Sequence, residues 1–319
     1  MKNIGKNKPM RIAIIGRTEI LYSTIQKLLD SGYNIPLILT AKEAPEYQRT
    51  KEDFRRLANE INSDFISNGN ICSLNNIKLI EKTLPLDLGV SMNYPGIIPK
   101  RIIDYFKNGI LNAHGGNLPL YRGNACQAWA IINGEKEIGF CIHKMVGGEL
   151  DAGDIIEKDY FPVNINTRIG DYYNWAQKKV PDLFLSAIKK LNNDPNYILQ
   201  KQSKDIKDIL RCYPRNPKDG RIDWAKSNLE VLRLINASSE PFSGAYCEFE
   251  GEKCIIWRAE LYPDNEKYCA VSGQIASKMD NGDVVVITGN GKLLIKEIQI
   301  EAKRTHPSYF LKSIRQRFE

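Results

Sequence analysis

Three side chains that could act together on one carbonyl group lie in the middle of the sequence. Asn112 and His114 end an apolar run that begins at Gly109, and Asp151 follows in the sequence Leu-Asp-Ala-Gly-Asp. An amide can donate to a developing oxyanion, an imidazole can take a proton near neutral pH, and a carboxylate can orient that imidazole. No serine or cysteine stands where a nucleophile is expected. The set therefore favours moving an acyl group onto an amine that attacks directly.

The pattern of elements around these residues predicts an open parallel sheet. Strands are expected at 11–16, 34–40, 88–92 and 110–114, with helical spacing at 19–30 and 54–61. Asn112 and His114 are two residues apart on one strand, so they point to the same side. Ligand and catalytic groups of such sheets gather at the carboxyl ends of the strands. Asn93, Asn112 and His114 all lie at such ends.

The pattern changes in the second half of the chain. A helix is expected near 125–134, strand-like pieces at 138–145 and 153–161, and a helix over 168–191. The polar stretch 196–217 is interpreted as a linker between a first domain, 10–195, and a second domain, 218–319. In the second domain a helix at 229–236 precedes five short strands, which suggest a small barrel: 245–250, 254–262, 272–276, 283–288 and 292–299.

Composition limits the function classes. The chain has 319 residues and a formal charge of +7. This charge suits an anionic ligand such as a nucleotide or nucleic acid, and it equally fits a mildly basic surface without functional meaning. Seven cysteines without a Cys-x-x-Cys pair argue against a zinc site and against a disulfide framework. We expect reduced thiols, no metal, no signal peptide, no membrane segment and a cytoplasmic location. Gly16 alone, without a Gly-x-Gly-x-x-Gly or Walker pattern, does not support a dinucleotide or ATP site.

Three motifs together resemble the formyltetrahydrofolate-dependent formyltransferases. They are Asn112-x-His114, Leu118-Pro119-x-Tyr121-Arg122-Gly123 and Leu150-Asp151-x-Gly153-Asp154. Residues 218–246 resemble the start of that family's C-terminal domain, and the likeness covers about residues 10–300. It implies an α/β protein with an N-terminal Rossmann-like open parallel sheet domain and a small C-terminal OB-like β-barrel. It also implies formyltetrahydrofolate as formyl donor and no metal.

The resemblance gives the three candidate catalytic residues their roles. Asn112 would stabilise the oxyanion of a tetrahedral intermediate, and His114 would accept a proton from the attacking amine. Asp151 would orient the imidazole, stabilise its charged form or relay a proton. His143 could contact substrate or be structural, and the sequence leaves this open. We interpret Asp154 as structural and His306 as a surface residue.

The folate is expected on the loop after the strand at 88–92. The resemblance places the pterin against Met92, Asn93, Tyr94, Pro95 and Gly96, which would hold it largely through backbone groups, with Leu118 and Arg122 beside it. Arg122 could hold a carboxylate or phosphate, or could only anchor its own loop through carbonyl groups.

Three acceptors compete. The stretch 40–53 corresponds to a glycine-rich basic loop of the tRNA formyltransferases, yet here it has no glycine and its acids balance its bases. The segments 44–47, 115–117, 214–220 and 241–244 look instead like the sugar N-formyltransferases. The expected acceptor is therefore a nucleotide-linked amino sugar, UDP- or dTDP-linked and 4-amino, for a surface polysaccharide such as lipopolysaccharide O-antigen. The candidate contacts are Lys42, Tyr47, Tyr94 and Arg122.

The alternatives explain less of the sequence. Methionyl-tRNA is the second candidate acceptor, although a nucleic-acid partner is not expected. A formyltetrahydrofolate hydrolase would use water and typically carries a regulatory domain before the catalytic one. A folate-binding scaffold that is not an enzyme would leave Asn112, His114 and Asp151 together without a reason. The oligomeric state stays open, with a homodimer as one option.

Overall fold

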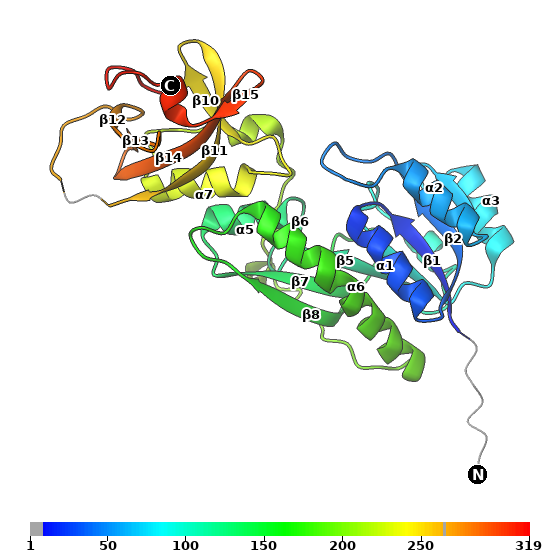
Figure 1. Cartoon of the computed structure of the whole chain (residues 1–319). Helices are drawn as coiled ribbons and strands as arrows, with labels where there is room; N and C mark the ends of the chain where they lie inside the picture. The colour runs from blue at the N-terminus through cyan, green and yellow to red at the C-terminus, as the bar shows by residue number, and fades with distance from the viewer. Residues whose placement is uncertain (1–8, 264–265) are drawn as a thin grey trace. The chain divides into compact units, whose positions relative to one another are not determined.

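The computed structural model describes residues 9–263 and 266–319, and these form two compact units (Figure 1). The first unit combines the chain up to Gly123 with residues 139–161 and 174–211. The second unit combines residues 124–138, 162–173 and 212–319. The domain and linker boundaries expected from the sequence stay a prediction.

The first unit is built on an open sheet. Among the described residues this sheet has seven strands in the order β3-β2-β1-β4-β5-β7-β8, coloured from blue to green in Figure 1. The strands are β1 (Arg11–Gly16), β2 (Asn34–Thr40), β3 (Asp64–Ser67), β4 (Leu88–Met92), β5 (Ile110–His114), β7 (Glu137–Lys144) and β8 (Ile155–Pro162). Strands β1 to β5 pair in parallel, which confirms the expected Rossmann-like sheet.

Strand β7 departs from the parallel pattern. It runs antiparallel to β5, with Leu111 opposite Lys144 and His114 opposite Cys141, so the sheet is mixed. Hydrophobic periodicity shows that a segment is extended and buried on one face, but the same pattern results whichever way the strand runs. The direction of β7 could therefore not be derived from the sequence.

The chain reverses its direction across the sheet between β1 and β4. It passes from β1 outward to β2 and β3, then returns to the other side of β1 at β4. Gly16 and Met92 are register partners at the carboxyl ends of these two strands. A Cβ on Gly16 would overlap the Met92 carbonyl oxygen, so only glycine permits this approach. Such a reversal leaves a crevice at the strand ends, where ligands of open α/β sheets bind.

Side-chain caps start the first two helices. Thr18 accepts from the Leu21 N–H at the start of α1, and Thr50 and Asp53 form a capping box at the start of α2. The helices are α1 (Glu19–Asp30), α2 (Lys51–Glu60), α3 (Leu74–Thr83), α4 (Lys100–Ile103), α5 (Cys126–Asn133), α6 (Ile169–Asn193) and α7 (Asn228–Ser238). Among the described residues, no helix is both long and apolar enough to cross a membrane.

Strand β3 and helix α3 are among the elements of the first unit that have no counterpart among the sequence-based expectations. Strand β3 has four residues, all half-buried, and lies at the edge of the sheet, so it lacks a strong apolar pattern. Helix α3 follows it and is capped by Ser73, whose side chain accepts from the Asn76 N–H. Strand β3 pairs with β2, and α3 packs on β2 and β3, on the side of the sheet that lies away from β5.

The second unit contains an antiparallel sheet, coloured from yellow to red in Figure 1. Its described strands follow the order β10-β11-β14-β13-β12, with β15 paired to β14. They are β10 (Ala245–Phe249), β11 (Glu252–Tyr262), β12 (Ile275–Lys278), β13 (Val284–Ile287), β14 (Lys292–Ile300) and β15 (Lys303–Thr305). Helix α7 packs on β11. The expected C-terminal β domain is confirmed, and β15 is an addition to it.

Short elements complete the described chain. A two-stranded pair joins β6 (Arg122–Gly123) to β9 (Arg211–Cys212). The single-turn helices are η1 (Ile206–Asp208), η2 (Pro217–Gly220) and η3 (Pro307–Tyr309).

The C-terminal residues join the two ends of the second sheet. Phe318 donates its N–H to the carbonyl of Gly273, just before β12, at 2.9 Å. Glu319 exchanges two backbone hydrogen bonds with Glu248 of β10, at 2.8 and 2.9 Å. The Phe318 ring is buried and stacks on Trp224 with ring centroids 5.3 Å apart. The chain end thus closes the sheet into a barrel around an apolar core.

This closure makes Phe318 a stability determinant of the second unit. We expect Phe318→Ala to lower the free energy of unfolding of that unit by about 3–5 kcal/mol, because it leaves a cavity beside Trp224. Urea unfolding followed by tryptophan fluorescence measures the loss. Ile314→Ala, at a side chain that is 56% exposed, is the control and should change stability by less than about 0.5 kcal/mol. Equal effects of the two substitutions would show that the chain end does not close the barrel.

Candidate active site

The antiparallel pairing of β5 with β7 assembles the first part of the site. Asn112 lies directly opposite His143, and His114 lies directly opposite Cys141. Opposite residues of an antiparallel pair share one face of the sheet, as do residues two apart on one strand. The four side chains therefore form one cluster within the first unit. His143, whose role the sequence left open, belongs to it.

Asp151 reaches this cluster from the loop between β7 and β8. Its carboxylate Oδ2 accepts the Gly123 N–H at 2.9 Å and lies 3.4 Å from Nδ1 of His114. Its Oδ1 lies 3.5 Å from Nε2 of His143. A Cβ on Gly153 would overlap the Lys144 carbonyl oxygen, so this glycine lets the loop return close to β7. The carboxylate is thereby held between two imidazoles.

His114 is fixed through both ring nitrogens. Its Nε2 lies 2.7 Å from the carbonyl oxygen of Tyr121, and a carbonyl oxygen only accepts, so Nε2 carries the hydrogen. Nδ1 is then the basic nitrogen of the neutral ring, and it faces Asp151. Tyr121 has a φ of 57°, in the left-handed region, which turns its carbonyl toward the imidazole. A proton taken up by the cluster would lie between His114 and Asp151.

Burial and charge set the protonation of this pair. Burial lowers the pKa of His114 below its ordinary value, and the Asp151 carboxylate opposes that shift. Burial by itself would raise the pKa of Asp151, but the facing imidazoles and the Gly123 N–H hold that pKa well below its usual range. At neutral pH the site therefore contains a neutral imidazole beside a carboxylate, which is a competent proton acceptor.

Cys141 does not act as a nucleophile. Its thiol is buried and donates to the Gly116 carbonyl oxygen at 3.3 Å. Burial raises the pKa of Cys141 to about 11, so the thiol stays protonated at neutral pH. The nucleophile must then come from the substrate, in agreement with direct attack by an amine.

Gln202 clamps two loops of the site. Its side-chain amide donates to the carbonyl oxygens of Asp151 and Gly153, at 2.9 and 2.6 Å, and accepts from Arg122 at 2.8 Å. Arg122 also donates to the Ser203 carbonyl oxygen, at 3.4 Å, so its described partners are two carbonyl oxygens of its own unit. Sequence reasoning placed Gln202 in a linker and gave it no role. Nothing in its sequence context marks it, because its partners are backbone groups from distant loops.

The expected pterin loop follows β4. Met92 is buried, whereas Asn93, Pro95 and Gly96 are exposed. The Tyr94 hydroxyl donates to the Asn68 carbonyl oxygen at 3.0 Å, and burial raises the pKa of Tyr94 to about 12. Leu118, expected beside the pterin, has its side chain buried with Cys141 and Ile155.

Arg17 is a residue of this region that the sequence analysis missed. It follows β1 and donates to the carbonyl oxygens of Lys42 and Asn93, with its guanidinium 5.4 Å from the ring centre of Tyr47. Asn93 in turn donates its side-chain amide to the Tyr47 hydroxyl at 2.8 Å. Lys42, Tyr47 and Asn93 are thus gathered around Arg17. Its position directly after the first strand of an open sheet was the signal that could have identified it.

The predicted contacts do not all join this group. Tyr94 and Arg122 are bonded to Asn68 and to Gln202 respectively, rather than to Lys42 or Tyr47. Their binding roles stay predictions.

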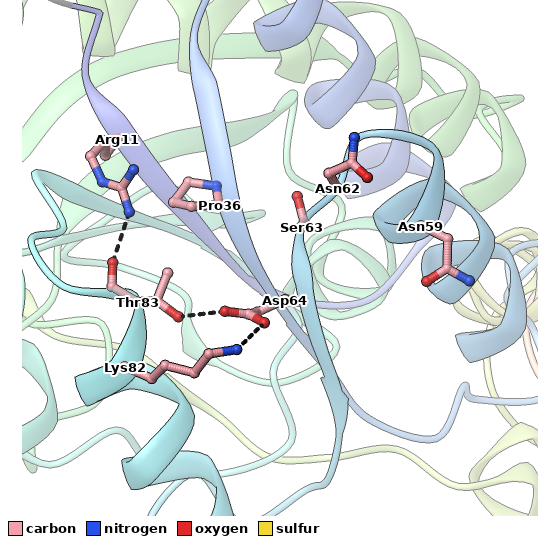
Figure 2. A pocket seen from close by; sticks show the side chains of 8 residues that line it. All are labelled: Arg11, Pro36, Asn59, Asn62, Ser63, Asp64, Lys82 and Thr83. Atoms are coloured by element: carbon pink, nitrogen blue, oxygen red, sulfur yellow. Dashed lines mark hydrogen bonds and ion pairs between the residues drawn. The ribbon is translucent and has the colours of Figure 1, made fainter.

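A pocket of about 500 Å³ lies at the opposite, amino ends of β1, β2 and β3 (Figure 2). Its charged groups are already paired: Arg11 donates to the Thr83 carbonyl oxygen and Lys82 contacts Asp64 at 3.0 Å. Its lining contains no histidine or cysteine, so it lacks the imidazole base of the β5–β7 cluster. Within residues 9–263 and 266–319, no group of three or more His, Cys, Asp or Glu is arranged to hold a metal ion. The expected absence of a metal stays a prediction.

Family models match both halves of the chain. The model for formyl transferase covers residues 10–188, and the model for formyl transferase, C-terminal domain, covers residues 215–315. The chain belongs to the formyl transferase family. The family-level resemblance seen in the motifs is confirmed. This formyltransferase is an enzyme that transfers formyl groups.

Named relatives point to two kinds of acceptor. The methionyl-tRNA formyltransferase of Alkaliphilus oremlandii is 30% identical over 302 residues, covering 92% of this chain and 93% of that protein. A sugar 3N-formyl transferase, WlaRD, solved in the presence of dTDP and 5-N-formyl-THF, has a TM-score of 0.67 at 21% identity and covers 93% of this chain and 100% of its own. The N-formyltransferase from Helicobacter canadensis, in complex with folinic acid and dTDP-3-aminofucose, has a TM-score of 0.66 at 19% identity, covering 92% and 100%. At these identities the structures show the shared fold.

The contact between Asp151 and His114 predicts a large kinetic effect. We expect Asp151→Asn to lower kcat by roughly 10²–10⁴-fold, because the amide neither stabilises the imidazolium nor relays a proton. Release of tetrahydrofolate under saturating substrates measures kcat, and circular dichroism checks the fold. A folded variant with near-normal kcat would remove Asp151 from the mechanism.

The pKa of His114 predicts the pH at which kcat/KM falls on the acidic side of the pH profile. Burial lowers that pKa, so the base stays neutral below the ordinary value of ~6.5, and kcat/KM should fall only at lower pH. The Asp151 carboxylate opposes the shift, so the residual activity of Asp151→Asn should fall at a still lower pH than that of the wild type. Profiles of kcat/KM from about pH 4.5 to 8.5 for the wild type and for Asp151→Asn test the direction of both shifts. A fall centred above pH ~6.5 in the wild type would contradict this reading.

Proposed function

We propose that this formyltransferase transfers the formyl group to the primary amine of a nucleotide-linked amino deoxy sugar. The acceptor would be UDP- or dTDP-linked with a 4-amino group, and the product would enter a surface polysaccharide such as lipopolysaccharide O-antigen. The donor is formyltetrahydrofolate.

The proposed mechanism uses the cluster on β5 and β7. The neutral amine attacks the formyl carbon, a C–N bond forms, and the formyl oxygen becomes an oxyanion that the Asn112 amide stabilises. The amine proton passes to the His114–Asp151 pair, whose facing atoms are 3.4 Å apart. The C–N bond to tetrahydrofolate then breaks, and the leaving nitrogen takes a proton from the same pair. In this mechanism Asn112 stabilises the oxyanion, and His114 and Asp151 together accept and return the proton.

The observation that carries the choice of acceptor is the charge of the loop before α2. Residues 40–53 contain three basic and four acidic side chains. Glu19 accepts the Gln48 N–H, and Glu43 accepts the Lys51 N–H, so carboxylates fasten this loop. A site for a tRNA end needs an excess of Lys and Arg against phosphates. A short, charge-balanced loop fits a small nucleotide sugar better.

Methionyl-tRNA is the second candidate because of the relatives. The methionyl-tRNA formyltransferase of Alkaliphilus oremlandii aligns with 92% of this chain, so both units are represented in it. The two acceptors differ in size and charge, which makes them easy to separate by experiment.

The decisive experiment offers formyltetrahydrofolate with each acceptor in turn. A panel of UDP-, dTDP- and GDP-linked amino sugars is tested beside methionyl-tRNA, and mass spectrometry detects the added formyl group. We expect a formylated nucleotide sugar and no formylated methionyl-tRNA. Formylation of methionyl-tRNA alone would overturn the sugar acceptor. Release of tetrahydrofolate without a formylated product would indicate hydrolysis.

Tyr47 provides a residue-level test of the acceptor site. We expect Tyr47→Phe to raise the acceptor KM by roughly 5–50-fold with little change in kcat, because it removes a hydroxyl that is bonded to Asn93 and is not part of the cluster on β5 and β7. Steady-state kinetics at saturating formyltetrahydrofolate measures both constants. Tyr105→Phe, whose hydroxyl donates to Glu81 at 2.8 Å, is the matched control. An unchanged acceptor KM in Tyr47→Phe would separate this tyrosine from acceptor binding.

A further inference from the structure

The partners of His143 indicate which of its ring nitrogens carries the hydrogen. Its Nδ1 lies 3.0 Å from the carbonyl oxygen of Lys144, which only accepts, so the hydrogen of the neutral ring is on Nδ1. Nε2 then carries a lone pair and can only accept. The nitrogen of the Asn112 side-chain amide lies 3.2 Å from it. The chain of bonds therefore runs from Asn112 to His143 to the Lys144 carbonyl.

This chain of bonds decides which way the Asn112 amide points. Turning the amide over would place its oxygen against the Nε2 lone pair, two acceptors facing each other. His143 thus holds the –NH₂ group of Asn112 in place, and the second N–H of that group remains for another acceptor. His143 is only 2% exposed, so solvent does not offer the amide an alternative orientation at this side.

Cross-strand geometry makes the arrangement rigid. Asn112 and His143 are direct partners in the β5–β7 pairing, so their backbones are fixed with respect to each other. The Asp151 carboxylate lies 3.5 Å from the same Nε2, and the His114 ring centre lies 6.4 Å from that of His143.

We propose that His143 is a positioning residue for formyl transfer. It orients the amide of Asn112 so that one N–H points at the oxygen that becomes negative in the transition state. This rests on the proposed role of Asn112 as the oxyanion donor. His143 touches neither substrate in this scheme and acts through Asn112 alone, which distinguishes it from His114.

Two substitutions separate positioning from packing. His143→Leu removes the acceptor and keeps the volume, and we expect kcat to fall by roughly 10–100-fold with the KM for formyltetrahydrofolate unchanged within about threefold. His143→Gln places an amide oxygen near the position of Nε2, and it should restore kcat to within about tenfold of the wild type. Equal losses in the two folded variants would overturn the proposal. Should His143→Leu fail to fold, His143→Gln and the cycle below still test it.

Phe140 offers a matched control on the same strand. It is buried on the opposite face of β7, with 1% of its surface exposed. Phe140→Leu should lower the melting temperature but leave kcat of the folded enzyme within about threefold of the wild type. A fall in kcat like that of His143→Leu would mean that any disturbance of β7 slows the reaction, and it would overturn a specific role for His143.

A double-mutant cycle with Asn112→Ala tests whether the effect of His143 on kcat depends on Asn112. If His143 acts through Asn112, replacing His143 by Gln or Leu in the Asn112→Ala background should lower kcat by less than about threefold further. If Asn112→Ala is slow and the His143 substitutions multiply its effect in full, the positioning role is wrong while the proposed role of Asn112 stands. If Asn112→Ala turns over like the wild type, the proposed mechanism itself fails, and the role of His143 fails with it.

Discussion

The antiparallel contact between β5 and β7 is the constraint on which the catalytic cluster depends. It places Asn112 opposite His143 and His114 opposite Cys141, on one face of the sheet. Strand pairing fixes the distance between opposite residues. It therefore brings together an amide, two imidazoles and a thiol, and no separate loop is needed to position them. The returning loop that carries Asp151 needs only one further feature, the close approach at Gly153. A parallel β7 would have required a crossover and a different register.

Burial gives this cluster its chemical character. The same low-polarity environment keeps Cys141 protonated and keeps His114 neutral, so the site holds a base and no nucleophile of its own. The carboxylate of Asp151 remains charged there because imidazoles and a backbone N–H face it. The hydrogen-bond donors and acceptors are fixed by carbonyl groups of Tyr121 and Lys144, which leave each ring only one neutral tautomer. Formyl transfer to an incoming amine is the reaction that such a site can support.

The contacts around Arg17 are of a different kind. Around Arg17 the contacts run from side chains to carbonyl oxygens of Lys42 and Asn93, so the cation fastens loops as well as offering a charge. The cluster on β5 and β7 and the contacts around Arg17, which follows β1, therefore lie at separate strands of one sheet.

The sequence by itself determined strands β1, β2, β4 and β5 of the first sheet, the second β unit, the family and the group Asn112, His114 and Asp151. Each rests on local information: apolar periodicity, turn residues or motifs of a few positions. The direction of β7, the closure of the barrel by Phe318 and the contacts of Arg17, His143 and Gln202 were decided only by the tertiary structure. These features depend on which distant backbone groups become neighbours. The sequence does not show which backbone carbonyl will bond to a histidine ring and so fix its tautomer. The hydrogen-bonding role of the histidine is therefore set by the fold.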